Sequence, residues 1–192
     1  MSSDFLKTET AKHVMKNNIM KDDFGWEIPV ESVPLPSRGI IYNPDSILYG
    51  KEVLQIKAMT ALEEDILLSQ ALIKEGSVIQ HLIKSCLIDK SINVNQLIAG
   101  DRNALMISIR ITGYGSNYPV SYDCGQCNKR NDTEVDLTTL EIKRLEIEPI
   151  ELGKNAFNFT LPVTKKKVVF KYLDANDEKN RQAKVDFLQK HT

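Results

Sequence analysis

The pattern of apolar and polar positions divides the chain into a helical middle and a strand-rich second half. From Thr60 onward, apolar residues recur every three or four positions, which is the spacing of one face of an α-helix. The pattern predicts a helix over 61–74, a second that starts near Ser77, and a third that follows Asp101. After Tyr118, apolar residues alternate with polar ones, which is typical of strands.

The predicted helices carry start and stop signals. Thr60 and Glu63 have the spacing of a capping box, so we interpret the acidic run 63–65 as capping rather than as a metal or acid–base cluster. Asp101 is interpreted as the N-cap of the third helix. Apolar faces are expected in the second helix at Val78, Ile79, Leu82, Ile83, Cys86 and Leu87, and in the third helix at Leu105, Met106 and Ile109.

Short antiparallel strands are expected around the helices. A hairpin is predicted with a turn over 124–130, and the chain should finish in a helix over 176–190. Single strands are expected at 53–58, 146–150, 157–161 and 167–172. The order of arm, helices, strands and helix indicates an α+β fold with an extended N-terminal arm, a compact group of helices and a small antiparallel β part.

The stretch VPLPSRGIIY, from Val33 to Tyr42, is stiff for its length. Pro34 and Pro36 favour a polyproline-like start, Gly39 allows a turn with positive φ, and residues 40–42 are expected to be extended and buried. We interpret this stretch as a lead-in that anchors an arm to the folded body. The predicted parts are the arm 1–32, the lead-in, strand and helices 33–117, the β part 118–175 and the C-terminal helix 176–192.

Composition narrows the class of protein. The 192 residues carry 25 basic and 26 acidic side chains, a net charge of −1 that argues against a dedicated nucleic-acid binder. No apolar run approaches the ~20 residues of a transmembrane helix, so no membrane partner is expected. Three cysteines argue against a disulfide framework. We expect a soluble protein made and kept in a cytoplasm.

Cys124 and Cys127 form the strongest chemical motif, a C-x-x-C in the predicted hairpin turn. Two thiolates at this spacing can bind one zinc ion, and Gly125 is expected to permit the turn, but zinc requires four ligands. No second pair follows ~15–20 residues later, and Cys86 is better explained as a core residue. A zinc site at Cys124 and Cys127 and a metal-free knuckle both stay open, whereas a redox motif is disfavoured because no helix begins there.

Other charged positions give no catalytic constellation. Arg110 is expected either to bind a carboxylate of another subunit or to be an ordinary surface arginine, and 165–167 reads as a solvated strand edge. His13 and His191 have no catalytic partners in the sequence. The chain contains no phosphate-binding loop, dinucleotide fingerprint, nucleophile elbow or H-E-x-x-H. Nothing in it predicts an enzyme.

The order of the motifs resembles the baseplate hub and hub-assembly proteins of T4-like contractile-tailed bacteriophages, over about 33–140. The motifs that carry the resemblance are Leu35-Pro-Ser-Arg-Gly39 with Tyr42, Met59-Thr-Ala-Leu-Glu-Glu64, Cys86 in an apolar helix, Leu97 with Asp101-Arg102, Ile109-Arg110 with Gly113-Tyr114-Gly115, and the pair Cys124 and Cys127.

The resemblance implies a late viral structural or assembly protein without catalysis, present in the host cytoplasm during assembly. A place in the virion tail and homo-oligomer formation both stay open. Its partners would be other hub proteins, and the partner contact is predicted at Pro34, Pro36, Arg38, Gly39 and Tyr42. Two alternatives are kept: a zinc-knuckle module that binds protein or nucleic acid, and a tail-associated cell-wall hydrolase.

Overall fold

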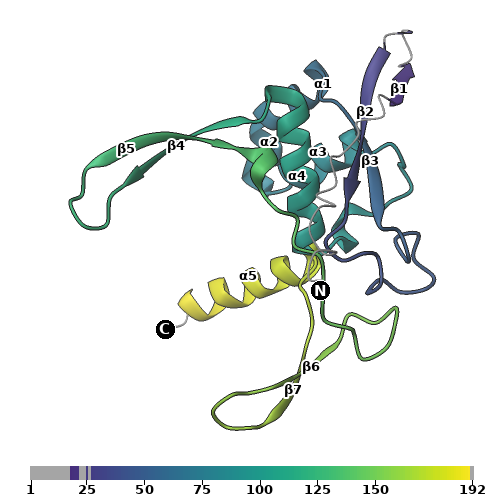
Figure 1. Ribbon diagram of the computed structural model, residues 1–192, viewed down its shortest axis with the longest axis vertical. Helices are drawn as coiled ribbons and strands as arrows, with labels where there is room; N and C mark the ends of the chain where they lie inside the picture. The colour runs from purple at the N-terminus through teal and green to yellow at the C-terminus, as the bar shows by residue number, and fades with distance from the viewer. Residues whose placement is uncertain (1–17, 22–24, 26, 191–192) are drawn as a thin grey trace, which may run out of the picture.

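The computed structural model describes residues 18–21, 25 and 27–190 and has the α+β fold predicted from the sequence (Figure 1). The strands are β1 (Asn18–Lys21), β2 (Glu27–Pro34), β3 (Val53–Lys57), β4 (Asn117–Asp123), β5 (Arg130–Asp136), β6 (Phe157–Thr160) and β7 (Lys167–Phe170). The α-helices are α1 (Ala61–Leu68), α2 (Gln70–Glu75), α3 (Val78–Cys86), α4 (Ala99–Tyr114) and α5 (Ala175–Lys190), with 3-10 turns η1 (Val94–Gln96) and η2 (Leu137–Thr139).

The core lies between an antiparallel sheet of order β1-β2-β3 and the helices α3 and α4. Alternate residues of β3, Leu54 and Ile56, point inward, as the period of a strand requires. From the helices, α3 contributes Ile83 and α4 contributes Leu105, both with no exposed side-chain surface. The apolar faces predicted for α3 and α4 therefore do form the core.

Two helix predictions need correction. The helix expected over 61–74 is two helices, because Ser69 is extended, with φ −65° and ψ 106°, and ends α1 while it begins α2. Asp101 does not cap the third helix. Helix α4 begins at Ala99 with Ile98 in the N-cap position, and the Asp101 carboxylate bonds to a different segment of the chain, described below.

The hairpin and the strands near 157–161 and 167–172 are confirmed as β4–β5 and β6–β7. The strand predicted at 146–150 is wrong, because this segment is irregular. Proline at position 149 removes one ladder donor, and the amide of Ile150 bonds to the Ala156 carbonyl within its own loop at 2.8 Å.

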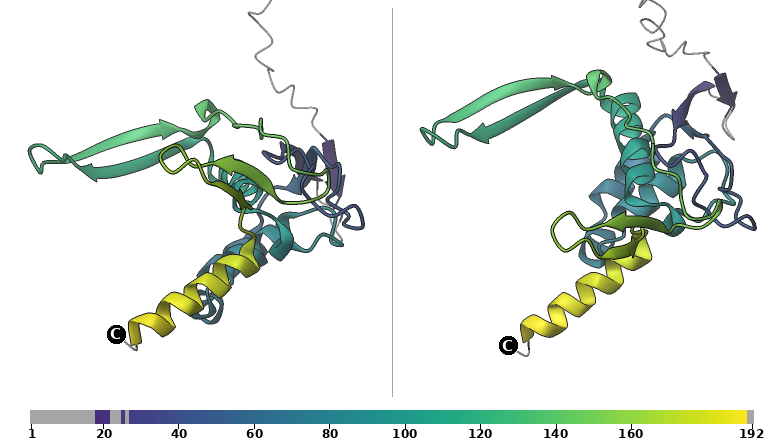
Figure 2. Two further views of the ribbon diagram at one scale, coloured as in Figure 1. Left: turned by 90° about the horizontal axis from the view of Figure 1, so that it is seen from below. Right: turned by 60° about the horizontal axis from the view of Figure 1, so that its bottom comes forward.

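Three elements project from the compact part, namely the β4–β5 hairpin, the β6–β7 hairpin and α5 (Figure 2). Each is fixed at its root. Phe157 of β6 is fully buried and stacks on Phe170, with ring centroids 5.3 Å apart. Arg102 of α4 pairs with Glu178 near the start of α5. Among the described residues, no helix combines the length and the apolar character needed to cross a bilayer.

Most of the segment predicted to be an arm lies outside the described residues, as do His13 and His191. Its described part forms β1 and the first residues of β2, which pair antiparallel with Asn18 opposite Val30. Strand β2 then continues into the lead-in, with Val33 opposite Leu54 of β3. The lead-in is therefore continuous with the central strand of the sheet.

Candidate functional site

The segment 35–42, called the lead-in loop here, turns back sharply after β2. Arg38 and Gly39 both have positive φ, 57° and 70°, and the Ile40 amide donates to the Ser37 carbonyl at 3.3 Å. The turn with a positive φ at Gly39 is thus confirmed. The extended conformation expected for 40–42 is wrong, because these residues continue the turn, although Ile41 and Tyr42 are buried as expected.

Asp101, in the first turn of α4, fixes the lead-in loop. Its Oδ1 accepts a hydrogen bond from the Ser37 amide at 2.9 Å, and its Oδ2 accepts from the Ser37 hydroxyl at 2.6 Å and from the Tyr42 hydroxyl at 2.5 Å. The Tyr42 oxygen in turn accepts from the Ile98 amide at 3.2 Å. The carboxylate therefore connects the loop to the helix through side chains that lie far apart in the sequence.

The Asp101 carboxyl group is fully buried and has no cationic partner among the hydrogen bonds above. Burial raises its pKa, and the hydrogen bonds from Ser37 and Tyr42 oppose that rise. Burial, followed by the nearby Asp101 charge, raises the pKa of Tyr42. A carboxyl group that is sealed from solvent and occupied by three donors serves to hold the loop rather than to transfer protons to a ligand.

The five residues predicted to contact a partner divide into two groups. Gly39 and Tyr42 are buried and shape the loop from inside. Pro36 and Arg38 are partly exposed on the outer surface of the loop, and Pro34 is partly exposed at the end of β2, directly before it. From the sequence, Asp101 was interpreted as an N-cap and Ser37 was named only within a motif of the resemblance, so the role of both in organising this loop was missed. An acidic residue in the first turn of a helix is also the signal of an N-cap.

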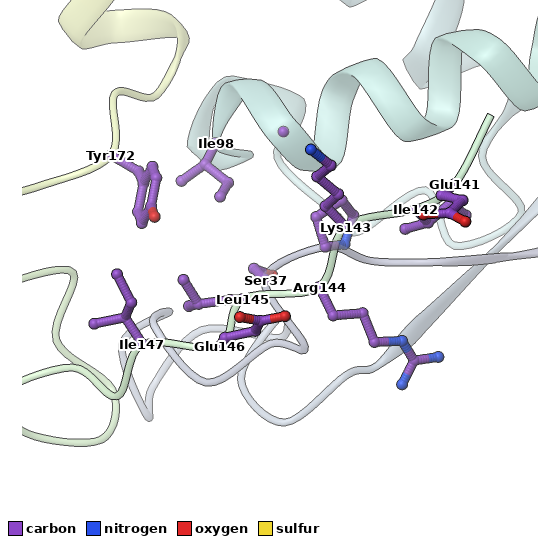
Figure 3. Close-up of a pocket in the computed structure, with 12 residues that line it drawn as sticks. Ser37, Ile98, Glu141, Ile142, Lys143, Arg144, Leu145, Glu146, Ile147 and Tyr172 are labelled. Carbon is purple, nitrogen blue, oxygen red and sulfur yellow. The ribbon is translucent and has the colours of Figure 1, made fainter. Parts of the chain in front are cut away.

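An open groove of about 830 Å³ lies beside the lead-in loop (Figure 3). The segment 141–147 forms one wall, and the Leu145 amide bonds to the Pro36 carbonyl at 2.8 Å. In Figure 3, apolar side chains gather at one end of the groove and Arg144 points away from it. These apolar side chains are Ile98, Leu145, Ile147 and Tyr172. The groove thus presents both apolar and charged side chains next to the lead-in loop.

Glu63, in the first turn of α1, is a second buried carboxylate. Thr60 donates to Glu63 Oε2 through its amide at 2.9 Å and its hydroxyl at 2.6 Å, which confirms the capping box. Lys57 Nζ lies 2.8 Å from Oε1, and the Ser85 hydroxyl donates to the same oxygen at 2.5 Å. Burial raises the pKa of Glu63, but the hydrogen bonds from Lys57, Ser85 and Thr60 outweigh it and lower the pKa from 4.5 to about 2.

Replacement of Glu63 by Gln should make the free energy of unfolding depend less on pH in the acid range. Because the folded pKa is depressed, the carboxylate stabilises the fold above pH 4.5, and this stabilisation is lost as pH falls toward about 2. The shift corresponds to about 3 kcal/mol. Urea unfolding at several pH values between these limits should show that the free energy of unfolding changes less with pH in E63Q than in wild type. Glu64→Gln, an exposed neighbour, should keep the wild-type slope, and a wild-type slope in E63Q would contradict the role.

Cys124 and Cys127 lie at the far tip of the β4–β5 hairpin, and Cys86 lies fully buried in the core. The structure therefore does not bring the third cysteine to the pair. Within the described ranges, no group of three or more metal-ligating side chains is assembled. Gly125 has ordinary φ and open space around it, so the turn does not depend on it; the residue with positive φ is Asn128, at 52°.

Arg110 makes intramolecular contacts at the root of the same hairpin. Its guanidinium lies 5.0 Å from the centre of the Tyr114 ring and 5.5 Å from that of Tyr118. It also donates to the Gly115 carbonyl at 2.9 Å and the Asn117 carbonyl at 3.4 Å. Arg110 thus fixes the direction in which the hairpin leaves α4.

Comparison with known proteins finds one family that covers most of the chain. A family model described as "T4 bacteriophage base plate protein" matches residues 41–190, which is more than three quarters of the chain. No curated protein and no solved structure matches. The match includes the later strands and α5, for which the sequence motifs gave no resemblance. The chain belongs to the T4 bacteriophage base plate protein family, and it is a structural protein of the phage tail base plate.

Proposed function

We propose that this base plate protein belongs to the hub, and that it is a late, non-enzymatic subunit or assembly factor that binds other hub proteins. The observation that carries the proposal is the β4–β5 hairpin, residues 117–136, called the ribbon here. It leaves the compact part and carries exposed aromatic side chains on one face. Protein partners recognise such surfaces.

The two faces of the ribbon differ in chemistry. Residues directly opposite in the antiparallel register share a face, and Tyr118 lies opposite Val135. The more apolar face consists of Tyr118, Val120, Tyr122, Asn131, Thr133 and Val135. The other face carries Ser121, Asp123, Arg130, Asp132, Glu134 and Asp136. A partner that covers the first face with an apolar strip and reaches the second face with basic side chains would complement both.

The exposed ribbon has a thermodynamic reason to bind. A two-stranded ribbon is at best marginally stable in water when neither face is covered. Tyr118 and Tyr122 are 45% and 53% exposed, and aromatic residues are the commonest anchors of protein interfaces. Since Arg110 already fixes the root, docking would order a short element rather than a whole domain.

The outer surface of the lead-in loop is proposed as a second contact. Pro36 and Arg38 are partly exposed there, as is Pro34 at the end of β2, and the groove formed with 141–147 lies beside Pro36. The buried Gly39 and Tyr42 would act by maintaining the shape of this surface. A lead-in loop fixed by Asp101 is rigid before it binds, which reduces the entropy lost in a complex.

The absence of catalysis is part of the proposal. It is supported by the two buried carboxylates, Asp101 and Glu63, each of which is occupied by donors of its own chain. A peptidoglycan-release assay with the purified chain should show no activity above buffer. Activity that disappears with a single carboxylate substitution would favour the cell-wall hydrolase alternative instead.

Tyr122→Ala should weaken partner capture. After co-expression with the neighbouring tail proteins, affinity isolation of the wild-type chain followed by mass spectrometry should recover hub proteins. Loss of one aromatic anchor should reduce that recovery about tenfold. Tyr49→Ala, which removes a tyrosine that is 40% exposed in the loop after β2, is the matched control and should leave recovery unchanged. Equal recovery with Y122A, or no tail protein with wild type, would contradict the proposal.

A further inference from the structure

The tip of the ribbon is a closed turn built around two cysteines. The Cys124 amide donates to the Lys129 carbonyl at 2.9 Å, and the Asn128 amide donates to the Cys124 carbonyl at 2.8 Å. Asn128 has φ 52°, which closes the loop tightly. Cys127 is exposed and Cys124 is partly exposed, so both thiols can be reached from solvent.

The three cysteines differ in what can reach them. Cys86 is fully buried in α3, whereas Cys127 is exposed and Cys124 is partly exposed at the turn. A metal ion binds cysteines that it can reach, in their thiolate form. Cys124 and Cys127 are therefore the two cysteines that are open to an incoming ion.

We propose that Cys124 and Cys127 are one half of a zinc site, which a second copy of the chain completes with its own Cys124 and Cys127. Structural zinc takes four ligands in a tetrahedron, and four thiolates are a common set. In the described part of one chain, no further metal-ligating side chain joins the pair. A two-fold pair of tips supplies the missing two thiolates without any other partner.

The position and charge of the tip suit such a pair. The ribbon extends away from the helices and the sheet in all views, so two tips can meet without collision between the two bodies (Figures 1 and 2). A zinc ion with four thiolates carries a net charge of about −2. Within residues 123–130, the two cations Lys129 and Arg130 stand against the single acid Asp123. This local charge offsets the negative cluster.

The test uses the full chain, purified with a phosphine reductant and freed of metal with a chelator. Addition of Zn²⁺ should give about one zinc ion per two chains by mass spectrometry after gel filtration. Light scattering should show a dimer that returns to monomer with a chelator. Co²⁺ in place of zinc should give the charge-transfer and strong visible bands of a tetrahedral thiolate site.

The variants separate this site from other causes of association. Cys124→Ser and Cys127→Ser should each remove the dimer and weaken zinc binding more than about tenfold, while circular dichroism stays as in wild type. Gln126→Ala keeps both thiols and the backbone amides, so it should bind zinc and dimerise as wild type does. In the zinc-free protein, a thiol reagent should modify Cys124 and Cys127 and leave Cys86 unmodified.

Three results would overturn the inference. These are no zinc binding by the reduced chain, one zinc ion per monomeric chain, and a dimer that forms equally well in Cys124→Ser. None of them bears on the capture of hub proteins by the apolar face of the ribbon, because Tyr122→Ala leaves both cysteines in place. The proposed function and the zinc site can therefore fail independently.

Discussion

Asp101→Ala is expected to lower the free energy of unfolding by about 4 kcal/mol. The substitution leaves three buried donors without their acceptor, namely the Ser37 amide, the Ser37 hydroxyl and the Tyr42 hydroxyl. Each unsatisfied buried group costs about 1–3 kcal/mol, and the lead-in loop loses its connection to α4. Urea unfolding followed by circular dichroism would measure the change.

Two variants of the same helix make the Asp101 result specific. Asp101→Asn keeps the volume, but its amide nitrogen cannot accept, so about half of the loss is expected. Asn103→Ala changes an exposed side chain two residues further along α4 and should stay within about 0.5 kcal/mol of wild type. If D101A unfolded at the wild-type midpoint, the carboxylate would not be the element that holds the loop.

The same residue shows where sequence reasoning reached its limit. An acidic side chain near the start of a helix usually bonds to the helix's own amides, so a local pattern assigns Asp101 as a cap. Its actual donors come from Ser37 and Tyr42, about sixty positions earlier, and no periodicity reports such a contact. By contrast, Thr60 and Glu63 are three residues apart, and the capping box predicted from that spacing is present.

Helices and hairpins with a strong local signal were predicted well. The alternation after Tyr118 gave the ribbon, and the amphipathic pattern of α3 gave its buried face. The strand expected at 146–150 failed because the same alternation of apolar and polar residues also suits an irregular segment whose apolar side chains line a groove, as Leu145 and Ile147 do. The pattern reports which side chains face the protein and not whether their backbone is paired.

The candidate site required the structure for a related reason. The ribbon was predicted as a hairpin, but its exposure was not, because a hairpin that packs on a sheet has the same alternation. Arg110 left two interpretations open, and its contacts with the rings of Tyr114 and Tyr118 now assign it to the ribbon's root. The position of Cys124 and Cys127 in one turn was expected from their spacing alone. The burial of Cys86 in the core, away from that turn, was only an expectation until the fold was known.

Gly39→Ala is expected to be the most damaging substitution of the lead-in loop that removes no hydrogen-bonding group. An added Cβ would lie 2.5 Å from the Lys51 amide nitrogen and 2.6 Å from the Lys51 carbonyl oxygen, and both are backbone atoms that cannot rotate away. The φ of 70° adds the usual cost of about 1 kcal/mol for a left-handed alanine. We expect a total loss of about 3 kcal/mol or more, measured by urea unfolding.

Gly50→Ala provides the control, because the two glycines differ only in their surroundings. Gly50 has φ 69° and open space where a Cβ would be placed, and its amide donates to the Gly39 carbonyl at 3.0 Å. G50A should therefore show the conformational cost alone, about 1 kcal/mol. The difference between the two variants measures how closely the lead-in loop approaches the chain at Lys51. If both variants lost the same stability, that close approach would not constrain the loop, and the rigidity proposed for its partner-facing surface would rest on Asp101 alone.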